Sequence, residues 1–396
     1  MIGSLAFIFI FGLMFAYMSE KLGLPRLVGM LIAGIVIGPY GLNLMDELIL
    51  SVSSQLRTIA LIIILIKAGL SLKIDDIKKV GRPALLLSFL PALCEWSAYV
   101  IFAPKLLTLH WIDAALLGAV IAAVSPAVVV PRMVDLMDHQ LGTDKRIPQM
   151  ILAGASLDDV FVIVLFSSFL TMSQTGQLHL SNLLNIPSSI VLGIVFGCVA
   201  GLMVSQLLNR VFNKESNAIK PAIILLGISF LLYAIEQWCD GIVAVSGLLA
   251  VMSCSMVVAG RLNHQCTVQL QNIFGNIWKG AEIILFVLVG SAVNVGYMVN
   301  AGLMALLMLV IGLATRMLGV LMALMHTHLN KKEKMYCLVA YCPKATVQAA
   351  IGGVPLALGL SCGNIILSCA VLSILITAPL GAYLMDKFKY RWLNQE

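Results

Sequence analysis

Long apolar runs separated by short polar stretches repeat along the whole chain. A helix needs roughly 20 apolar residues to cross the hydrocarbon core of a bilayer. Runs that approach or reach this length lie near residues 2–18, 27–40, 58–72, 83–102, 111–130, 150–172, 189–208, 221–238, 242–259, 281–295, 302–324, 335–357 and 365–385. The pattern predicts an all-α polytopic membrane protein with about thirteen transmembrane helices. The polar run over 261–279 is expected to be an amphipathic connector on the membrane surface.

The composition agrees with this pattern. Of the 396 residues, 60% are hydrophobic and 11% are charged, whereas about 25% are charged in ordinary soluble domains. No polar stretch is long enough for a separate soluble domain, so residues 1–396 are expected to form a single membrane unit. The nine cysteines have no metal-like spacing, and we expect packing residues and no disulfide framework. Loop residues explain the net charge of +6, so no nucleic-acid partner is predicted.

The basic residues lie mainly on one side of the predicted membrane. Loops after odd-numbered runs carry 20 of the 25 lysines and arginines, and loops after even-numbered runs carry only Arg57 and Lys105. Cytoplasmic loops are the ones enriched in basic residues. The N-terminus is therefore predicted outside and the C-terminus in the cytoplasm, in a multi-pass protein of the cell or inner membrane.

Thirteen crossings would allow two inverted repeats, runs 1–6 and runs 8–13, joined by run 7. Transporters with such repeats place broken helices at matching positions of the two halves. Run 5 contains Ser125-Pro126 and run 12 contains Pro343-Lys344, and these runs are equivalent in the scheme. Proline removes a backbone hydrogen bond and disfavours helix in the residue before it. We predict two discontinuous crossing helices whose freed backbone groups face polar surroundings; two ordinary proline kinks are the alternative.

Asp158 and Asp159 lie inside run 6, where each charge costs roughly 3 kcal/mol on insertion scales. Neighbouring side chains on a helix diverge by roughly 100°. One aspartate is therefore expected to face the broken helices and the other a cationic partner. Desolvation and mutual repulsion favour protonation of such a pair, which titrates as a coupled unit. The pair could hold a proton and a desolvated monovalent cation in turn; the alternative is permanent burial in salt bridges.

Three further charges lie inside apolar runs and need partners: Glu95 in run 4, Arg316 in run 11 and Lys344 in run 12. Either Lys344 or Arg316 is expected to pair with Asp158, and Glu95 with Arg316. A structural ion pair between Glu95 and Arg316 is an equal alternative to a functional one.

Small hydroxyl residues near the aspartates are candidate oxygen ligands for a cation. They are Ser125, Ser156 and Thr346. Such residues also serve helix packing in membranes, which is the alternative role.

Three stretches, residues 124–131, 154–159 and 343–352, together resemble the monovalent cation:proton antiporter superfamily, most closely its sodium/proton antiporter-B branch. Residues 24–39 and 64–70 resemble further motifs of that branch. The resemblance implies that Asp159 is the essential cation- and proton-binding carboxylate, with Asp158 its neighbour. It also implies that Arg316 and Lys344 are the basic residues of the eleventh and twelfth segments.

The resemblance further implies how the segments divide. A core, or transport, domain would comprise residues 83–172 and 302–385, and a dimer, or scaffold, domain residues 1–72 and 221–295, with a linking helix at 189–208. The core would move against the dimer domain like an elevator, in a homodimer. Two adjacent aspartates resemble the electrogenic class of the superfamily, but that rule has exceptions in this branch, so the stoichiometry stays open.

The predicted function is secondary active exchange of Na⁺ or Li⁺ for H⁺, without a cofactor beyond the transported ions. A K⁺/H⁺ antiporter or K⁺ efflux system is one alternative. A sodium-coupled organic-anion symporter is another, although a buried acid pair would disfavour an anionic substrate. A membrane enzyme is not expected, because the sequence shows no nucleophile pattern, metal cluster or phosphate loop.

Overall fold

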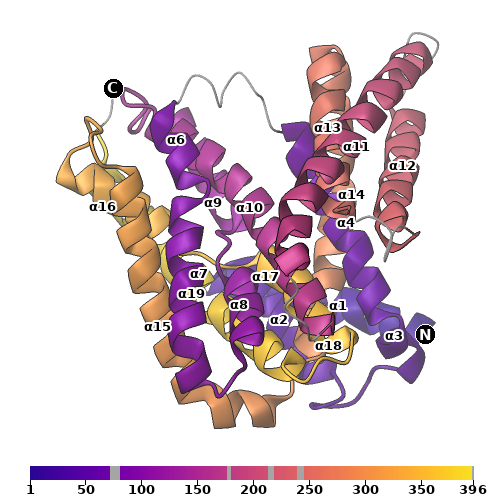
Figure 1. The fold of residues 1–396 in the computed structure, drawn as a ribbon, viewed down its shortest axis with the longest axis vertical. Helices are drawn as coiled ribbons and strands as arrows, with labels where there is room; N and C mark the ends of the chain where they lie inside the picture. Colours follow the sequence, from indigo (N-terminus) through magenta and orange to yellow (C-terminus); the bar gives the residue numbers. More distant parts are fainter. Residues whose placement is uncertain (72–80, 176–179, 213–217, 239–244, 395–396) are drawn as a thin grey trace. The chain divides into compact units, whose positions relative to one another are not determined.

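The computed structural model describes residues 1–71, 81–175, 180–212, 218–238 and 245–394. Within these ranges the chain forms helices joined by turns and short loops, without a β-strand (Figure 1). The predicted all-α class is confirmed.

The helices of the first half are α1 (Ile2–Lys21), α2 (Arg26–Ile37), α3 (Glu47–Ser51), α4 (Ser53–Ser71), α6 (Arg82–Leu87), α7 (Leu90–Leu106), α8 (Trp111–Ile121), α9 (Pro126–Asp138), α10 (Ile147–Thr175) and α11 (Leu180–Phe212). Those of the second half are α12 (Ile219–Trp238), α13 (Gly247–Arg261), α14 (His264–Ser291), α15 (Val295–Ala323), α16 (Lys331–Ala340), α17 (Thr346–Gly352), α18 (Val354–Ala357) and α19 (Gly363–Trp392).

Each predicted apolar run coincides with one or more helices. Ten helices in the described part of the chain are long and apolar enough to cross a membrane. Three shorter apolar helices, Arg26–Ile37, Gly247–Arg261 and Thr346–Ala357, lie in the second, ninth and twelfth runs. The number of thirteen crossings stays a prediction, because these three are shorter than a full span.

Both predicted discontinuities are present, and the alternative of two simple kinks is wrong. Helix α8 ends at Ile121 and α9 begins at Pro126; α16 ends at Ala340 and α17 begins at Thr346. Pro126 occupies the first position of α9, where its missing N–H would have no intrahelical partner in any case. The sequence therefore ends one helix and begins another at mid-run.

Two details of the sequence prediction need correction. The run over 261–279 is not a separate connector, because α14 continues without a break for 28 residues from His264 to Ser291. Arg57 is not in a loop, because α4 already begins at Ser53. The Arg57 side chain is buried against Gly353, where a Cβ would overlap its guanidinium group.

The chain divides into two compact units. Unit 1 comprises Met1–Arg57, Asp76–Gln174 and Ile283–Glu396, and unit 2 comprises Thr58–Asp75 and Thr175–Glu282. All of the predicted site residues lie in unit 1. The functional division into a dimer domain and a core domain stays a prediction.

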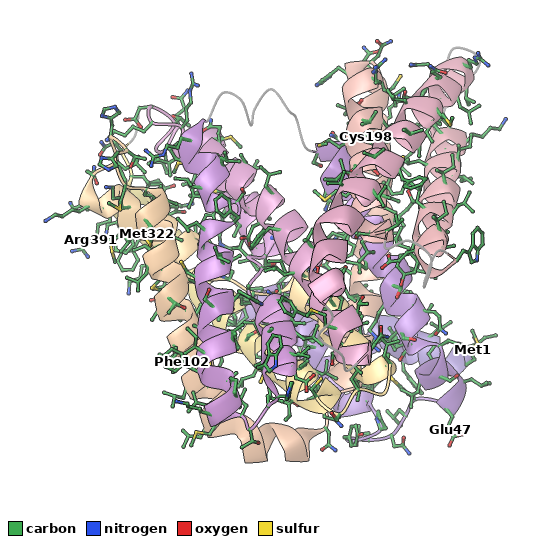
Figure 2. All side chains as sticks on the ribbon, viewed as in Figure 1. Met1, Glu47, Phe102, Cys198, Met322 and Arg391 are labelled. Atoms are coloured by element: carbon green, nitrogen blue, oxygen red, sulfur yellow. The ribbon has the colours of Figure 1, made fainter. Side chains whose placement is uncertain are left out.

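Large apolar side chains cover the outer faces of several helices. Phe102 of α7 and Met322 of α15, both labelled in Figure 2, are 42% and 50% exposed. Leu303 and Val310, also on α15, are exposed as well. A surface of this kind is unfavourable in water and suited to lipid tails. It belongs to an integral, multi-pass membrane protein.

Candidate functional site: a buried charge cluster at two crossing helix breaks

The two helix breaks contact each other directly. The Ser125 N–H donates to the Pro343 carbonyl at 2.8 Å. The Gln348 side-chain amide donates to the carbonyls of Ile121 at 3.0 Å and Ala123 at 2.8 Å. Backbone groups freed at membrane depth need such partners. The freed groups thus face polar partners, and each break supplies hydrogen-bond partners to the other.

Helices α7 and α15 approach closely beside the breaks. A Cβ on Gly312 of α15 would lie 2.7 Å from the Tyr99 ring of α7. Glu95 and Arg316 are one turn away from these two residues on their respective helices. The close approach brings their side chains together, with Arg316 Nη1 2.9 Å from Glu95 Oε2.

Arg316 is buried and connects four segments. Besides Glu95, its guanidinium donates to the Tyr341 carbonyl at 2.7 Å, to the Ala122 carbonyl and to Asp158 Oδ2 at 3.1 Å. Ala122 and Tyr341 each belong to one of the two breaks. A planar guanidinium with five donors suits this role, because it can reach several acceptors at once.

Lys344 pairs with Glu95, and its ammonium nitrogen lies 2.5 Å from Glu95 Oε2. Its backbone N–H donates to the Thr377 hydroxyl of α19 at 2.8 Å. The structure therefore resolves the open pairings. Arg316 contacts both Glu95 and Asp158, whereas Lys344 forms its ion pair with Glu95 and not with Asp158.

The two adjacent aspartates have different surroundings. Asp158 is fully buried, and its Oδ2 accepts from the Val124 N–H at 2.7 Å and from Arg316. Asp159 is 8% exposed and makes no ion pair with the described residues. Its Oδ1 is buried without a hydrogen-bond partner among them. The predicted division of roles is only partly correct, because Asp158 contacts both the first break, through Val124, and the cationic Arg316.

The charges of the cluster explain this difference. Glu95 and Asp158 are matched by Arg316 and Lys344, two acids against two bases. Asp159 is the acid left over. A buried charge without a partner is strongly unfavourable, so Asp159 is the position in the cluster where a proton or a cation would restore neutrality.

The candidate hydroxyl ligands are only partly brought together. Ser125 and Thr346 are buried at the crossing, and the Ser125 hydroxyl accepts from the Thr346 N–H at 3.4 Å. Ser125 is also the residue before α9, and Thr346 is the first residue of α17. The Ser156 side chain lies outside the described side chains.

Three polar residues of the site were missed from the sequence. Gln348 joins the breaks, and its Oε1 also accepts from the Ala345 N–H at 2.8 Å. Thr377 holds the backbone of Lys344, and Tyr341 packs its ring 5.6 Å from the Arg316 guanidinium carbon. A glutamine at the third position of a helix is half of a capping box, which was the available signal for Gln348.

The family model described as "Sodium/hydrogen exchanger, transmembrane" matches residues 5–385. The chain belongs to this family. The resemblance to the monovalent cation:proton antiporter superfamily is thereby confirmed.

Known members of the exchanger family align over most of the chain. Sodium/hydrogen exchanger 9B1 of Mus musculus is 33% identical over 385 residues, which are 94% of this chain and 66% of that protein. Sodium/hydrogen exchanger 9B2 of Homo sapiens is 32% identical over 383 residues, which are 94% of this chain and 70% of that protein. This exchanger thus spans about two thirds of the length of these relatives.

The fold is that of a solved antiporter. The sodium proton antiporter MjNhaP1 from Methanocaldococcus jannaschii superposes with a TM-score of 0.82, at 20% identity, over 99% of this chain and 98% of that chain. At this level of identity the likeness concerns the fold. It agrees with the all-α architecture described above.

Proposed function

We propose that this exchanger carries Na⁺ or Li⁺ in exchange for H⁺, and that Asp159 binds the two ions in turn. The charge balance of the cluster carries the proposal, since Asp159 is the buried carboxylate without a counter-charge. The family and its named sodium/hydrogen exchangers support the choice of ions. Binding at one carboxylate makes proton and cation compete, and this competition couples their movements.

The proposed cycle follows from that competition. A proton leaves Asp159, a partly dehydrated cation takes its place, and hydroxyl oxygens of Ser125, Thr346 and Ser156 are proposed as further ligands. Asp158 stays bound to Arg316 and fixes the geometry of the pair. After the site opens to the other side, a proton displaces the cation. The cycle uses the transported ions and no resident cofactor. The only covalent bond that forms and breaks is the one between the proton and the Asp159 carboxylate.

Alternating access is proposed to follow the elevator scheme. In this scheme residues 83–172 and 302–385 move as the core against residues 1–72 and 221–295, with 189–208 as the link. Distances between spin labels on the two sets should change when Na⁺ replaces H⁺; distances that stay fixed in both conditions would exclude the scheme.

We also propose a homodimer in the cell or inner membrane, with the N-terminus outside and the C-terminus in the cytoplasm. The distribution of basic loop residues supports this orientation. Mass measurement of the purified protein tests the dimer. A reporter fused to the C-terminus, active only in the cytoplasm, tests the orientation and would be silent if it is reversed.

The exchange itself is tested in proteoliposomes that contain a pH-sensitive dye. A Na⁺ or Li⁺ gradient should drive proton movement in the wild-type protein, and Asp159→Asn should abolish it. Asp144→Asn is the matched control, because Asp144 is an exposed aspartate outside the cluster. Exchange by Asp159→Asn at the wild-type rate would refute the proposed site.

The same vesicles distinguish the other candidate functions. Proton movement driven by K⁺ and not by Na⁺ or Li⁺ would make the protein a K⁺/H⁺ antiporter. K⁺ flux without proton movement would indicate a K⁺ efflux system. Na⁺ uptake that needs an organic anion would indicate a symporter.

A further inference from the structure

Tyr341 places a buried hydroxyl group in the charge cluster. It lies in the break between α16 and α17, and its side chain is fully buried. Its backbone carbonyl and its ring both contact Arg316. Its hydroxyl, however, has no hydrogen-bond partner among the described residues. Buried tyrosine hydroxyls usually have a partner, so this group calls for a physical explanation.

The hydroxyl lies against Gly154 of α10. A Cβ on Gly154 would overlap the Tyr341 oxygen and would lie 2.9 Å from Leu87 Cβ. Only a glycine leaves this space open. Gly154 is four residues before Asp158, so the two residues lie on the same face of α10, one turn apart.

The Asp158 side chain is expected to extend toward the same place. Helical side chains point back toward the N-terminus of their helix and cover the preceding turn. The preceding turn of Asp158 contains Gly154, where the Tyr341 hydroxyl lies. Asp158 Oδ2 has two donors, but Oδ1 is buried without one among the described residues. A buried donor and a buried acceptor thus belong to the same face of α10, and neither has a hydrogen-bond partner among the described residues.

We propose that Tyr341 is a positioning residue for Asp158, and that its hydroxyl donates to Asp158 Oδ1 through one bridging water molecule, to set the pH at which exchange begins. The inference rests on the proposed role of the Asp158/Asp159 pair in binding the proton. It adds a residue from the second helix break to the group that controls proton release.

The surroundings contain a small set of groups that titrate or carry charge. Those that act on Tyr341 or Asp158 are Asp159 on α10, Glu95 on α7, Arg316 on α15, Cys337 on α16 and Lys344 in the second break. Helix α6 contributes the apolar Leu87 at this point. In this set Tyr341 supplies a neutral hydroxyl donor, and Asp158 Oδ1 is a buried acceptor without a partner among the described residues.

The direction of the effect follows from the donor. A hydroxyl that donates to a carboxylate stabilises its charged form, so its loss makes the aspartate pair hold the proton more firmly. Exchange by Tyr341→Phe should therefore begin at a more alkaline pH. The expected shift is about one pH unit, which corresponds to the free energy of one hydrogen bond to a charged group.

The test measures the pH dependence of Na⁺-driven proton movement in proteoliposomes. Tyr341→Phe should show the alkaline shift. Tyr336→Phe is the matched control, since Tyr336 is a buried tyrosine of the neighbouring α16, and it should keep the wild-type profile. A wild-type profile in Tyr341→Phe, or an equal shift in Tyr336→Phe, would overturn the inference.

Gly154→Ala gives an independent check. Its added methyl group displaces the Tyr341 hydroxyl and should shift the profile in the same direction. In the Tyr341→Phe background it should add less shift than in the wild-type protein, because the contact with the hydroxyl oxygen is gone and the contact with Leu87 Cβ at 2.9 Å remains. An unshifted Gly154→Ala, or two shifts that add in full, would contradict the inference. Wild-type exchange in Asp159→Asn would instead refute the proposed function itself.

Discussion

Asp158 and Asp159 are chemically identical, and their surroundings give them different roles. Asp158 accepts hydrogen bonds from the Val124 N–H and from the Arg316 guanidinium, so its charge is compensated inside the protein. Asp159 has no such compensation from the described residues. Burial makes the energetic difference between the two carboxylates large, because solvent screens buried charges only weakly. In this pair, Asp158 stabilises the structure of the site. Asp159 is available to bind ions.

Glu95 offers a residue-scale prediction about stability. It is the acid shared by Arg316 and Lys344. Glu95→Gln would leave two buried cations with Asp158 as their only strong partner in the cluster. Breaking a buried ion pair in this way costs on the order of 3–5 kcal/mol, so we expect a clearly lower melting temperature in detergent.

Two variants complete this experiment. Glu47→Gln changes an exposed glutamate at the molecular surface (Figure 2) and should leave the melting temperature unchanged. Glu95→Gln with Lys344→Gln removes one acid and one base, and should be more stable than Glu95→Gln alone. Additive losses in this double variant would show that Glu95 and Lys344 are not coupled.

At the residue scale, the unfavourable groups could be predicted, and Arg316 was a candidate partner for both Asp158 and Glu95. The choice between Arg316 and Lys344 and the pair of Lys344 with Glu95 could not be predicted. Charges inside apolar runs are conspicuous in the sequence, and Asp158, Arg316 and Lys344 were found in this way. Which acid meets which base depends on distances across three helices, which composition does not contain. Tyr341 was missed because tyrosine is unremarkable in an apolar helix until its hydroxyl is known to be buried.

At the scale of elements, the two breaks act as one unit. Backbone and side-chain hydrogen bonds join the loop after α8 to the loop before α17 and to α17 itself. Arg316 reaches a carbonyl in each loop. The positions of the breaks could be predicted from Pro126 and Pro343, because proline removes a backbone hydrogen-bond donor from its own segment. The contact between the breaks is a long-range feature, and only the equivalence of runs 5 and 12 pointed to it.

Gln348 is the side chain through which the crossing can be tested. Gln348→Met would leave two carbonyls and the Ala345 N–H without their partner. Each buried group left unsatisfied costs about 1–3 kcal/mol. We expect a strong loss of thermal stability together with a loss of transport.

Gln149→Met is the matched control for this variant. Gln149 lies on α10, and its Oε1 has no hydrogen-bond partner among the described residues. Its replacement should cost much less stability. Equal losses in the two variants would mean that the hydrogen bonds of Gln348 do not hold the crossing together.

The helix boundary at α14 shows another limit of the sequence. The change from polar to apolar residues near Gly280 suggested a surface connector followed by a new segment. The helix continues because neither proline nor a strong turn signal interrupts it between His264 and Ser291. Composition changed along this helix while the backbone conformation stayed the same.

For the whole molecule, the charge balance predicts the stoichiometry of exchange. Asp158, Glu95, Arg316 and Lys344 keep their partners in the proposed cycle, and only Asp159 changes occupant. One H⁺ should then exchange for one Na⁺, without net movement of charge. The two adjacent aspartates resemble the electrogenic class. The ion pair between Asp158 and Arg316 leads us instead to expect electroneutral exchange.

This prediction is tested by imposing a membrane potential on the proteoliposomes. The rate of Na⁺/H⁺ exchange should be the same with the potential clamped at zero and with a large potential of either sign. A rate that follows the potential would mean that a second group, Asp158 or Lys344, also releases its proton in the cycle.

The order of the cluster along the chain has a consequence for biosynthesis. Its three acids, Glu95, Asp158 and Asp159, are translated before its two bases, Arg316 and Lys344. During insertion, α7 and α10 enter the bilayer while their counter-charges do not yet exist, so these acids must enter protonated or wait at the membrane surface. A nascent chain that ends before α15 is therefore a poor membrane protein. We therefore expect the charges of the cluster to be matched only after Arg316 and Lys344 have been inserted, late in biosynthesis.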